Sequence, residues 1–178
     1  MKTVIAFFRG INVGGRHILP MHELLETLEN MGLENVQTYI QSGNVIFQSQ
    51  QGHSAGLSSA ISSSIEDSKG FRPGVFLLNR KELQTAVENN PFNIDDGKLV
   101  HFFFLSAIPN DTDPDSLAAL KSDTEEYKLI NRVFYLYAPD GIGRSKLAAK
   151  VEKALGVPIT ARNWNTVRKV LSLATASS

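Results

Sequence analysis

Two short segments of this chain are apolar at nearly every position, which predicts strands buried on both faces. Val4–Phe8 and Phe102–Leu105 each carry large apolar side chains at consecutive positions. Because successive residues of a strand point to opposite faces of the sheet, neither face of these strands can lie in water. The second face must be covered by the other half of the chain, by the C-terminal helix or by another subunit.

The residue patterns predict the order β-α-β-β-α-β, followed by a connecting helix and a second, similar order. A helix near 79–90 is expected from the pair Asn79 and Glu82, which can form a capping box, and from the stop at Asn90-Pro91. The other expected helices lie at 21–31, 57–70, 114–120, 146–155 and from 163 onward. The expected strands lie at 3–8, 36–40, 45–47, 74–78, 99–105, 127–130 and 133–138.

The predicted fold class is α+β, with two ferredoxin-like halves of βαββαβ type in tandem. The second half is expected to be incomplete, since only 157–161 stands where its fourth strand would be, and a C-terminal helix follows. The expected division is a ferredoxin-like half over 1–79, a connecting helix and loop over 80–97, and the second half with the C-terminal helix over 98–178.

Composition excludes several classes of function. The chain has 178 residues, with Lys plus Arg and Asp plus Glu equal at 18 each, and it has no cysteine. The balanced charge argues against bulk nucleic acid and anionic membranes as partners, and the lack of cysteine excludes disulfides and thiolate chemistry. The four histidines lack metal-ligand spacing, so neither a metal nor a cofactor is predicted. The N-terminus has the pattern of a strand rather than a signal peptide, and a cytoplasmic location is expected.

The segment Arg9–Arg16 follows the first strand and has the composition of an anion-binding loop. Its glycines allow close backbone approach, and its arginines can clamp an oxyanion. The candidate ligand-binding residues here are Arg9, Asn12, Gly14, Gly15 and Arg16. The alternative is a tight strand-to-helix turn in which Asn12 caps backbone groups.

Two further polar segments lie near the C-terminus. Arg144, Ser145 and Lys146 open a predicted helix, whose free N–H groups favour anions. Arg162, Asn163 and Asn165 stand beside Trp164 at the start of the last helix and are the remaining ligand-binding candidates. The alternative is that Ser145 and Asn163 only cap their helices and that Trp164 belongs to the core.

The segment Tyr39–Asn44 is predicted to be a hairpin turn, with positive φ angles at Gly43 and Asn44. We expect this turn at the end of the sheet opposite to the Arg9–Arg16 loop. It would then join a pocket with that loop only through the other half of the chain or through a second subunit.

Four stretches resemble one known family in their order and spacing: FFRGINVGGR, TYIQSGNVIF, GIGRSKL with the following LGV, and TARNWNTVRKV. The family is the domain of unknown function 1697, and the resemblance spans about residues 3–173. It implies a small bacterial protein with an α+β fold, and it implies no substrate.

The function predicted from these residues is binding of a small anionic ligand, either phosphate-bearing or nucleotide-like. The alternatives are an enzyme of transferase or hydrolase type that uses the same groups, and an RNA or protein interaction module. The sequence leaves catalysis undecided, and a homodimer is compatible with it.

Overall fold

A computed structural model of the chain describes residues 1–177, which form two compact units of the α+β class. Unit 1 comprises residues 1–85 and the C-terminal segment that begins at Lys169, and unit 2 comprises residues 86–168. Helices α3 (Arg80–Glu88) and α6 (Trp164–Ala176) therefore each contribute residues to both units. No described helix combines the length and the apolar character needed to cross a membrane.

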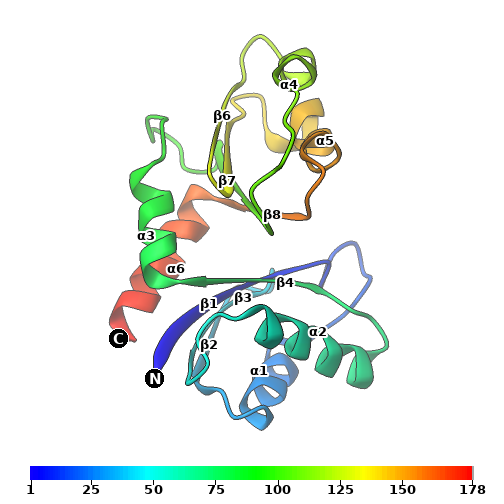
Figure 1. Cartoon of the computed structure of the whole chain (residues 1–178), viewed down its shortest axis with the longest axis vertical. Coiled ribbons are helices and arrows are strands. Elements are labelled where there is room, and N and C mark those ends of the chain that lie inside the picture. Colours follow the sequence, from blue (N-terminus) through cyan, green and yellow to red (C-terminus); the bar gives the residue numbers. More distant parts are fainter. Residues whose placement is uncertain (178) are drawn as a thin grey trace. The chain divides into compact units, whose positions relative to one another are not determined.

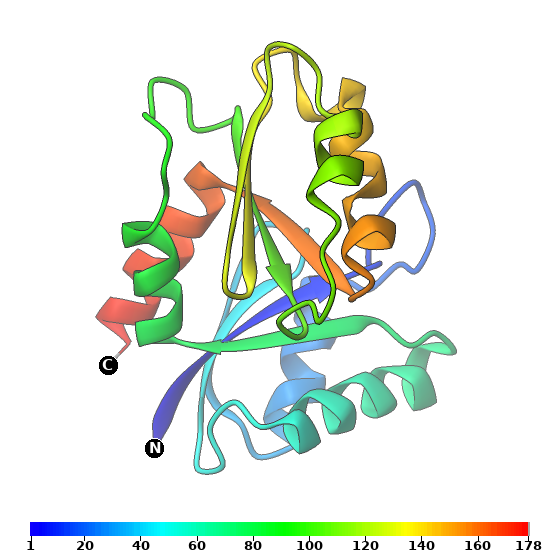
Figure 2. The same ribbon diagram turned by 45° about the horizontal axis from the view of Figure 1, so that its top comes forward.

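Unit 1 is a four-stranded antiparallel sheet with two helices on one face (Figures 1 and 2). Its strands lie in the order β2-β3-β1-β4, so β1 is paired on both sides. In chain order its elements are β1 (Lys2–Arg9), α1 (Met21–Asn30), β2 (Glu34–Tyr39), β3 (Asn44–Ser49), α2 (Ala55–Lys69) and β4 (Gly74–Asn79).

Both faces of β1 are buried, as its sequence predicts. Val4, Ala6 and Phe8 pack in the core beneath α1 and α2, while Ile5 and Phe7 point to the other face and are also buried. At the β2–β3 edge of that second face, the end of α6 is bound by two amides. Gln37 Nε2 donates to Ser177 Oγ at 3.2 Å, and Gln48 Nε2 donates to the Ser177 carbonyl at 2.9 Å. The C-terminal helix thus contributes to covering unit 1.

Local signals fix the helix ends in unit 1. Helix α2 starts where Ser54 Oγ accepts a hydrogen bond from Leu57 N, and it stops at Gly70, whose φ is 76°. Helix α3 starts at the predicted capping box, in which Glu82 N donates to Asn79 Oδ1 and Asn79 N donates to Glu82 Oε2, both at 2.8 Å. The predicted stop at Gly70 and the predicted capping box are confirmed, whereas α2 begins two residues before the expected start at Leu57.

Unit 2 is a second four-stranded antiparallel sheet, with strand order β6-β7-β5-β8. Its core lies between the sheet and helices α4 and α5, which pack against each other (Figure 1). The remaining elements of the chain are β5 (Val100–Leu105), α4 (Pro114–Leu120), β6 (Glu126–Ile130), β7 (Val133–Tyr137), the 3-10 turn η1 (Ile142–Arg144), α5 (Lys146–Leu155) and β8 (Ile159–Asn163).

The expectation that the second half lacks its fourth strand is wrong. Strand β8 pairs antiparallel with β5 along its whole length, from Ile159 opposite Leu105 to Asn163 opposite His101. Its sequence, Ile-Thr-Ala-Arg-Asn, does not have the apolar pattern of a central strand. Because β8 lies at the edge of the sheet and is paired on one side only, polar side chains are tolerated there. The strand exists through its pairing with β5 rather than through its own propensity.

His101 is a polar residue inside unit 2. It lies on β5 opposite Leu136 and is only 8% exposed, and its Nε2 is buried without a hydrogen-bond partner among residues 1–177. Burial lowers the pKa of His101 below its ordinary value, and a hydrogen bond with the backbone of Lys98 offsets part of this effect. The folded chain therefore favours the neutral imidazole.

The buried imidazole predicts a specific loss of stability in acid. The unfolded chain takes up a proton at His101 near pH 6.5, the ordinary value for histidine, whereas the folded chain resists it until a lower pH. The neutral His101 side chain makes its full contribution to the free energy of unfolding above about pH 6.5. As the pH decreases from 6.5, this contribution decreases by at most about 1.4 kcal/mol per pH unit. Urea unfolding of wild type and His101→Gln from pH 7.5 to 5 measures it. Wild type should lose stability faster than the variant, and parallel profiles would contradict the prediction.

Candidate ligand-binding site

The Arg9–Arg16 loop and the Tyr39–Asn44 turn lie at the same end of the sheet of unit 1. Phe7 is paired with Asn44, and Phe8 N donates to the Gly43 carbonyl at 2.8 Å, so the turn lies beside the end of β1. The expectation that the turn lies at the opposite end is wrong. Helix α1 carries the chain back to the end of the sheet at which β1 begins. Strand β2 therefore runs parallel to β1, and both strands finish at the opposite end.

Asn12 joins the loop to the turn. Its Oδ1 accepts a hydrogen bond from Leu19 N at 2.8 Å, and its Nδ2 donates to the carbonyls of Leu19 at 2.9 Å and Gln41 at 3.0 Å. Its backbone is left-handed, with φ at 52°, a conformation that asparagine tolerates better than most residues. Asn12 thus carries out the capping role that the sequence analysis gave as the alternative to ligand binding.

The tip of the loop is a small hairpin. Val13 and Arg16 form an isolated β-bridge around Gly14 and Gly15, whose φ angles are 58° and 71°, as in a type I′ turn. Within this loop, Arg16 N donates to the Val13 carbonyl and Asn12 N donates to the His17 carbonyl. The side chain of Val13 is 67% exposed. These N–H groups are therefore bound within the loop, and the tip points into solvent.

The Tyr39–Asn44 turn has positive φ at Ile40 and Gly43, not at Asn44 as expected. Asn44 is fully buried, and its Nδ2 donates to the Tyr39 carbonyl and to Ser42 Oγ, both at 3.0 Å. Ile40 is 51% exposed and has φ at 51°, which is costly for a β-branched residue. The side chain of Asn44 holds this strained turn closed.

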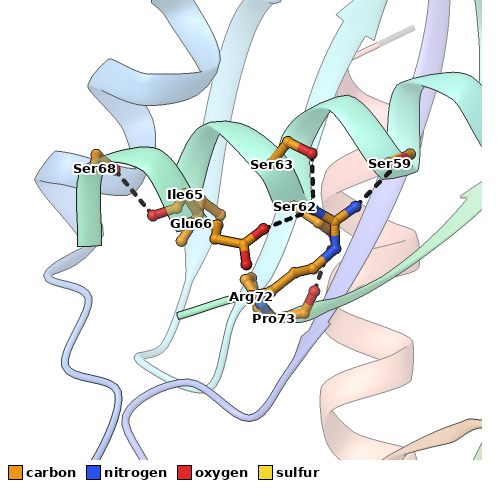
Figure 3. A network of polar contacts seen from close by, with 8 residues as sticks. All are labelled: Ser59, Ser62, Ser63, Ile65, Glu66, Ser68, Arg72 and Pro73. Atoms are coloured by element: carbon orange, nitrogen blue, oxygen red, sulfur yellow. Dashed lines mark hydrogen bonds and ion pairs between the residues drawn. The ribbon is translucent and has the colours of Figure 1, made fainter. Parts of the chain in front are cut away.

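Arg72 shows how an arginine with a structural role is bound in this unit (Figure 3). Its guanidinium donates to Glu66 Oε2 and Ser63 Oγ at 2.8 Å and to Ser59 Oγ at 3.2 Å, which ties the start of β4 to α2. By contrast, Arg16 is exposed and forms no ion pair among the described residues, and Arg9 is also exposed. Arg16 is therefore available to a ligand.

In unit 2, two of the predicted ligand residues cap helices. Ser145 Oγ accepts a hydrogen bond from Ala148 N at 3.0 Å, and Asn163 Oδ1 accepts one from Thr166 N at 3.0 Å. Arg144, Lys146 and Asn165 are exposed. The alternatives offered for Ser145 and Asn163 are therefore present in the structure, and they leave Arg144 and Lys146 as exposed cations beside the start of α5.

Arg162 has a different environment. It lies on β8 opposite Phe102 and is half-buried, and its Nη1 donates to Thr160 Oγ1 at 2.9 Å and to the Ala161 carbonyl at 2.8 Å. Burial lowers the pKa of Arg162 from its ordinary value to about 10. The guanidinium remains protonated at neutral pH, but its charge is held partly away from water.

The candidate residues divide between the two units. Arg9, Asn12, Gly14, Gly15 and Arg16 belong to unit 1 and share one loop, whereas Arg144 to Lys146 and Arg162 to Asn165 belong to unit 2. The sequence analysis did not include Thr160 in the site, although its hydroxyl contacts Arg162. Residues i and i+2 of a strand share a face, so recognising β8 as a strand would have paired them.

Comparison with known proteins identifies a family. The model described as "Protein of unknown function (DUF1697)" matches residues 1–135, about three quarters of the chain. The chain belongs to this family. The match includes the Arg9–Arg16 loop and the Tyr39–Asn44 turn of this DUF1697 protein, while the segments around Arg144 and Arg162 lie beyond it.

A solved structure resembles this DUF1697 protein along nearly its whole length. The conserved bacterial protein SP0830 from Streptococcus pneumoniae is 26% identical, with a TM-score of 0.67, and the alignment covers 97% of this chain and 98% of that one. A search of curated proteins found no significant match. The comparisons thus support the fold beyond residue 135 and leave the function to be argued from the site.

The Tyr39–Asn44 turn predicts a strict need for glycine at position 43. A Cβ there would lie 2.6 Å from Phe8 Cβ and 2.7 Å from Ile11 Cδ1, at a φ of 77°. Gly15 has a similar φ of 71° and open space around it, so Gly15→Ala isolates the backbone cost, about 1 kcal/mol. Gly43→Ala should add steric strain and cost roughly 2–4 kcal/mol. Urea unfolding measures both, and equal losses would show that the turn adapts freely.

Proposed function

We propose that this protein binds a small anionic, phosphate-bearing ligand, and that Arg162 is the group on which binding depends. The supporting observation is a protonated guanidinium that is half-buried on the edge strand β8 and whose pKa burial lowers to about 10. A guanidinium in this position can donate charge-assisted hydrogen bonds to a phosphate, and reduced screening by water strengthens their attraction.

The atoms around Arg162 suit a phosphate. Arg162 Nη1 donates to two neutral oxygens, those of the Thr160 side chain and the Ala161 backbone. A planar guanidinium can donate two parallel hydrogen bonds to a phosphate, which a lysine cannot do. Thr160 is 3% exposed, and its hydroxyl lies 2.9 Å from the same guanidinium, where it can accept from Arg162 or donate to a bound oxyanion.

The arginine-bearing loops have a supporting part in this proposal. Arg16 in unit 1, and Arg144 and Lys146 in unit 2, are exposed and form no ion pair among the described residues. Such cations attract anions through long-range electrostatics and are screened by salt. The backbone N–H groups of the Arg9–Arg16 loop have a smaller role than its composition predicts, because those of Asn12 and Arg16 are bound to nearby carbonyls.

We also infer that both units are ferredoxin-like and form a tandem pair. In support, each unit has the element order β-α-β-β-α-β, and the strand order β2-β3-β1-β4 in unit 1 corresponds to β6-β7-β5-β8 in unit 2. On this view β8 is the last strand of the second repeat, as β4 is the last strand of the first, and Arg162 lies on β8.

The proposal predicts stabilisation by inorganic pyrophosphate. At a ligand concentration of 100 times Kd, the melting temperature of wild type should rise by roughly 5–10 °C. Arg162→Gln, which keeps polar donors but removes the charge, should abolish the rise. Arg162→Lys, which keeps the charge but loses the planar fork, should leave a smaller one. Thermal unfolding at several pyrophosphate concentrations measures all three.

Arg72→Gln is the matched control. Arg72 is bound to Glu66, so its loss should lower the melting temperature without ligand and leave the rise with pyrophosphate unchanged. The proposal fails if wild type shows no rise, or if Arg162→Gln shows the same rise as wild type. Sodium chloride at equal ionic strength separates specific binding from screening.

A further inference from the structure

Unit 2 contains a cavity of about 350 Å³ between the segment that leads into β5 and the paired strands β6 and β7. It lies apart in the sequence from every residue of the proposed anion site. Its wall combines two aromatic rings, those of Phe92 and Tyr137, with three carboxylates, those of Asp95, Asp96 and Glu126. A volume of this size is in the range of small-molecule sites.

The charge of the cavity selects for a cation. No lysine, arginine or histidine is among the residues that line it, so three carboxylates set its potential. The phosphate-bearing ligand proposed for Arg162 would be repelled here. The two features of the protein therefore call for ligands of opposite charge.

The aromatic rings point to an organic cation. Phe92 and Tyr137 have ring centroids 6.2 Å apart and planes inclined by 38°. Ring faces attract ammonium groups, and they offer nothing comparable to a hydrated metal ion. No group of acidic, histidine or cysteine side chains in the described residues is close enough to hold a metal ion. The carboxylates are thus spread around the cavity rather than gathered at one point.

The cavity is held in shape by backbone and side-chain contacts. On one side, Glu126 is directly opposite Tyr137 in the β6–β7 pair, so their side chains share a face of the sheet. On the other side, Asn90 Nδ2 donates to the Phe92 carbonyl at 2.9 Å, and Lys98 N donates to Asp96 Oδ1 at 2.9 Å. A preformed wall lowers the entropic cost of binding.

Gly97 fixes the same segment against the start of α6. A Cβ at this position would lie 2.1 Å from Asn165 Oδ1 and 2.8 Å from Trp164 Cδ1. Because the φ of Gly97 is not in the left-handed region, the glycine is needed for this close approach and not for its conformational freedom. The close packing restricts the backbone at the position next to Asp96.

We propose that this cavity binds a polyamine, an alkyl chain that carries more than one ammonium group. The ammonium groups would pair with carboxylates contributed by two separate segments, Asp95 and Asp96 from the loop and Glu126 from β6. The alkyl chain and one ammonium would lie against the rings of Phe92 and Tyr137. This site is independent of the proposed anion function.

Calorimetric titration of the full chain with spermidine tests the proposal. Wild type should bind spermidine, and butylamine, with a single ammonium, should bind at least about 10-fold more weakly. Glu126→Gln and Phe92→Leu should each weaken spermidine binding by about 5-fold or more. Asp67→Asn, which removes an exposed carboxylate from α2 in unit 1, should bind as wild type does.

Several outcomes would overturn the proposal. They are the absence of spermidine binding to wild type, equal affinity for butylamine, and an equal loss of affinity in Asp67→Asn and Glu126→Gln, which would indicate general attraction to surface carboxylates. If Glu126→Gln does not fold, the spermidine affinity of Phe92→Leu tests the proposal by removing an aromatic ring from the cavity wall. Retention of full affinity in Phe92→Leu would also contradict it.

Discussion

The antiparallel pairing of β1 with β3 is the interaction on which the arrangement of the loops in unit 1 depends. Phe7 opposite Asn44 sets the register, and that register brings the Gly43 carbonyl to the N–H of Phe8. With the turn fixed there, Asn12 can reach the Gln41 carbonyl and hold the Arg9–Arg16 loop against it. A shift by one residue would turn the buried side chains of β3 toward the wrong face, so the burial of β1 and β3 protects the geometry of the loops.

Three polar residues that resemble ligand contacts in the sequence satisfy backbone groups in the fold. Asn12 binds the backbone of Leu19 and Gln41, while Ser145 and Asn163 cap α5 and α6. Buried or half-buried backbone N–H groups need hydrogen-bond acceptors, and the side-chain oxygens of asparagine and serine are suitable ones. Arg162 stands apart because it brings a charge into a half-buried position. Its attraction to an anion is screened less there than in open water, which is why the proposed function depends on it.

The sequence predicts local features well and distant ones poorly. The bounds of α5, Lys146–Leu155, follow from Ser145 before it and Gly156 after it, and the capping box of Asn79 and Glu82 is likewise contained in four residues. Strand β8 was missed because its polar residues become a strand only through pairing with β5. The place of the Tyr39–Asn44 turn was wrong because it depends on the direction of β2, which α1 sets. The pKa of Arg162 could not be predicted at all, since burial is a property of the fold.

The proposed function requires that the half-buried guanidinium of Arg162 on β8 binds an anion. A crystal structure of the protein grown with millimolar pyrophosphate tests this requirement. We expect an oxyanion within hydrogen-bond distance of the Arg162 guanidinium. A well-ordered structure from such crystals, with pyrophosphate elsewhere or with Arg162 bound only to its own neighbours, would contradict it.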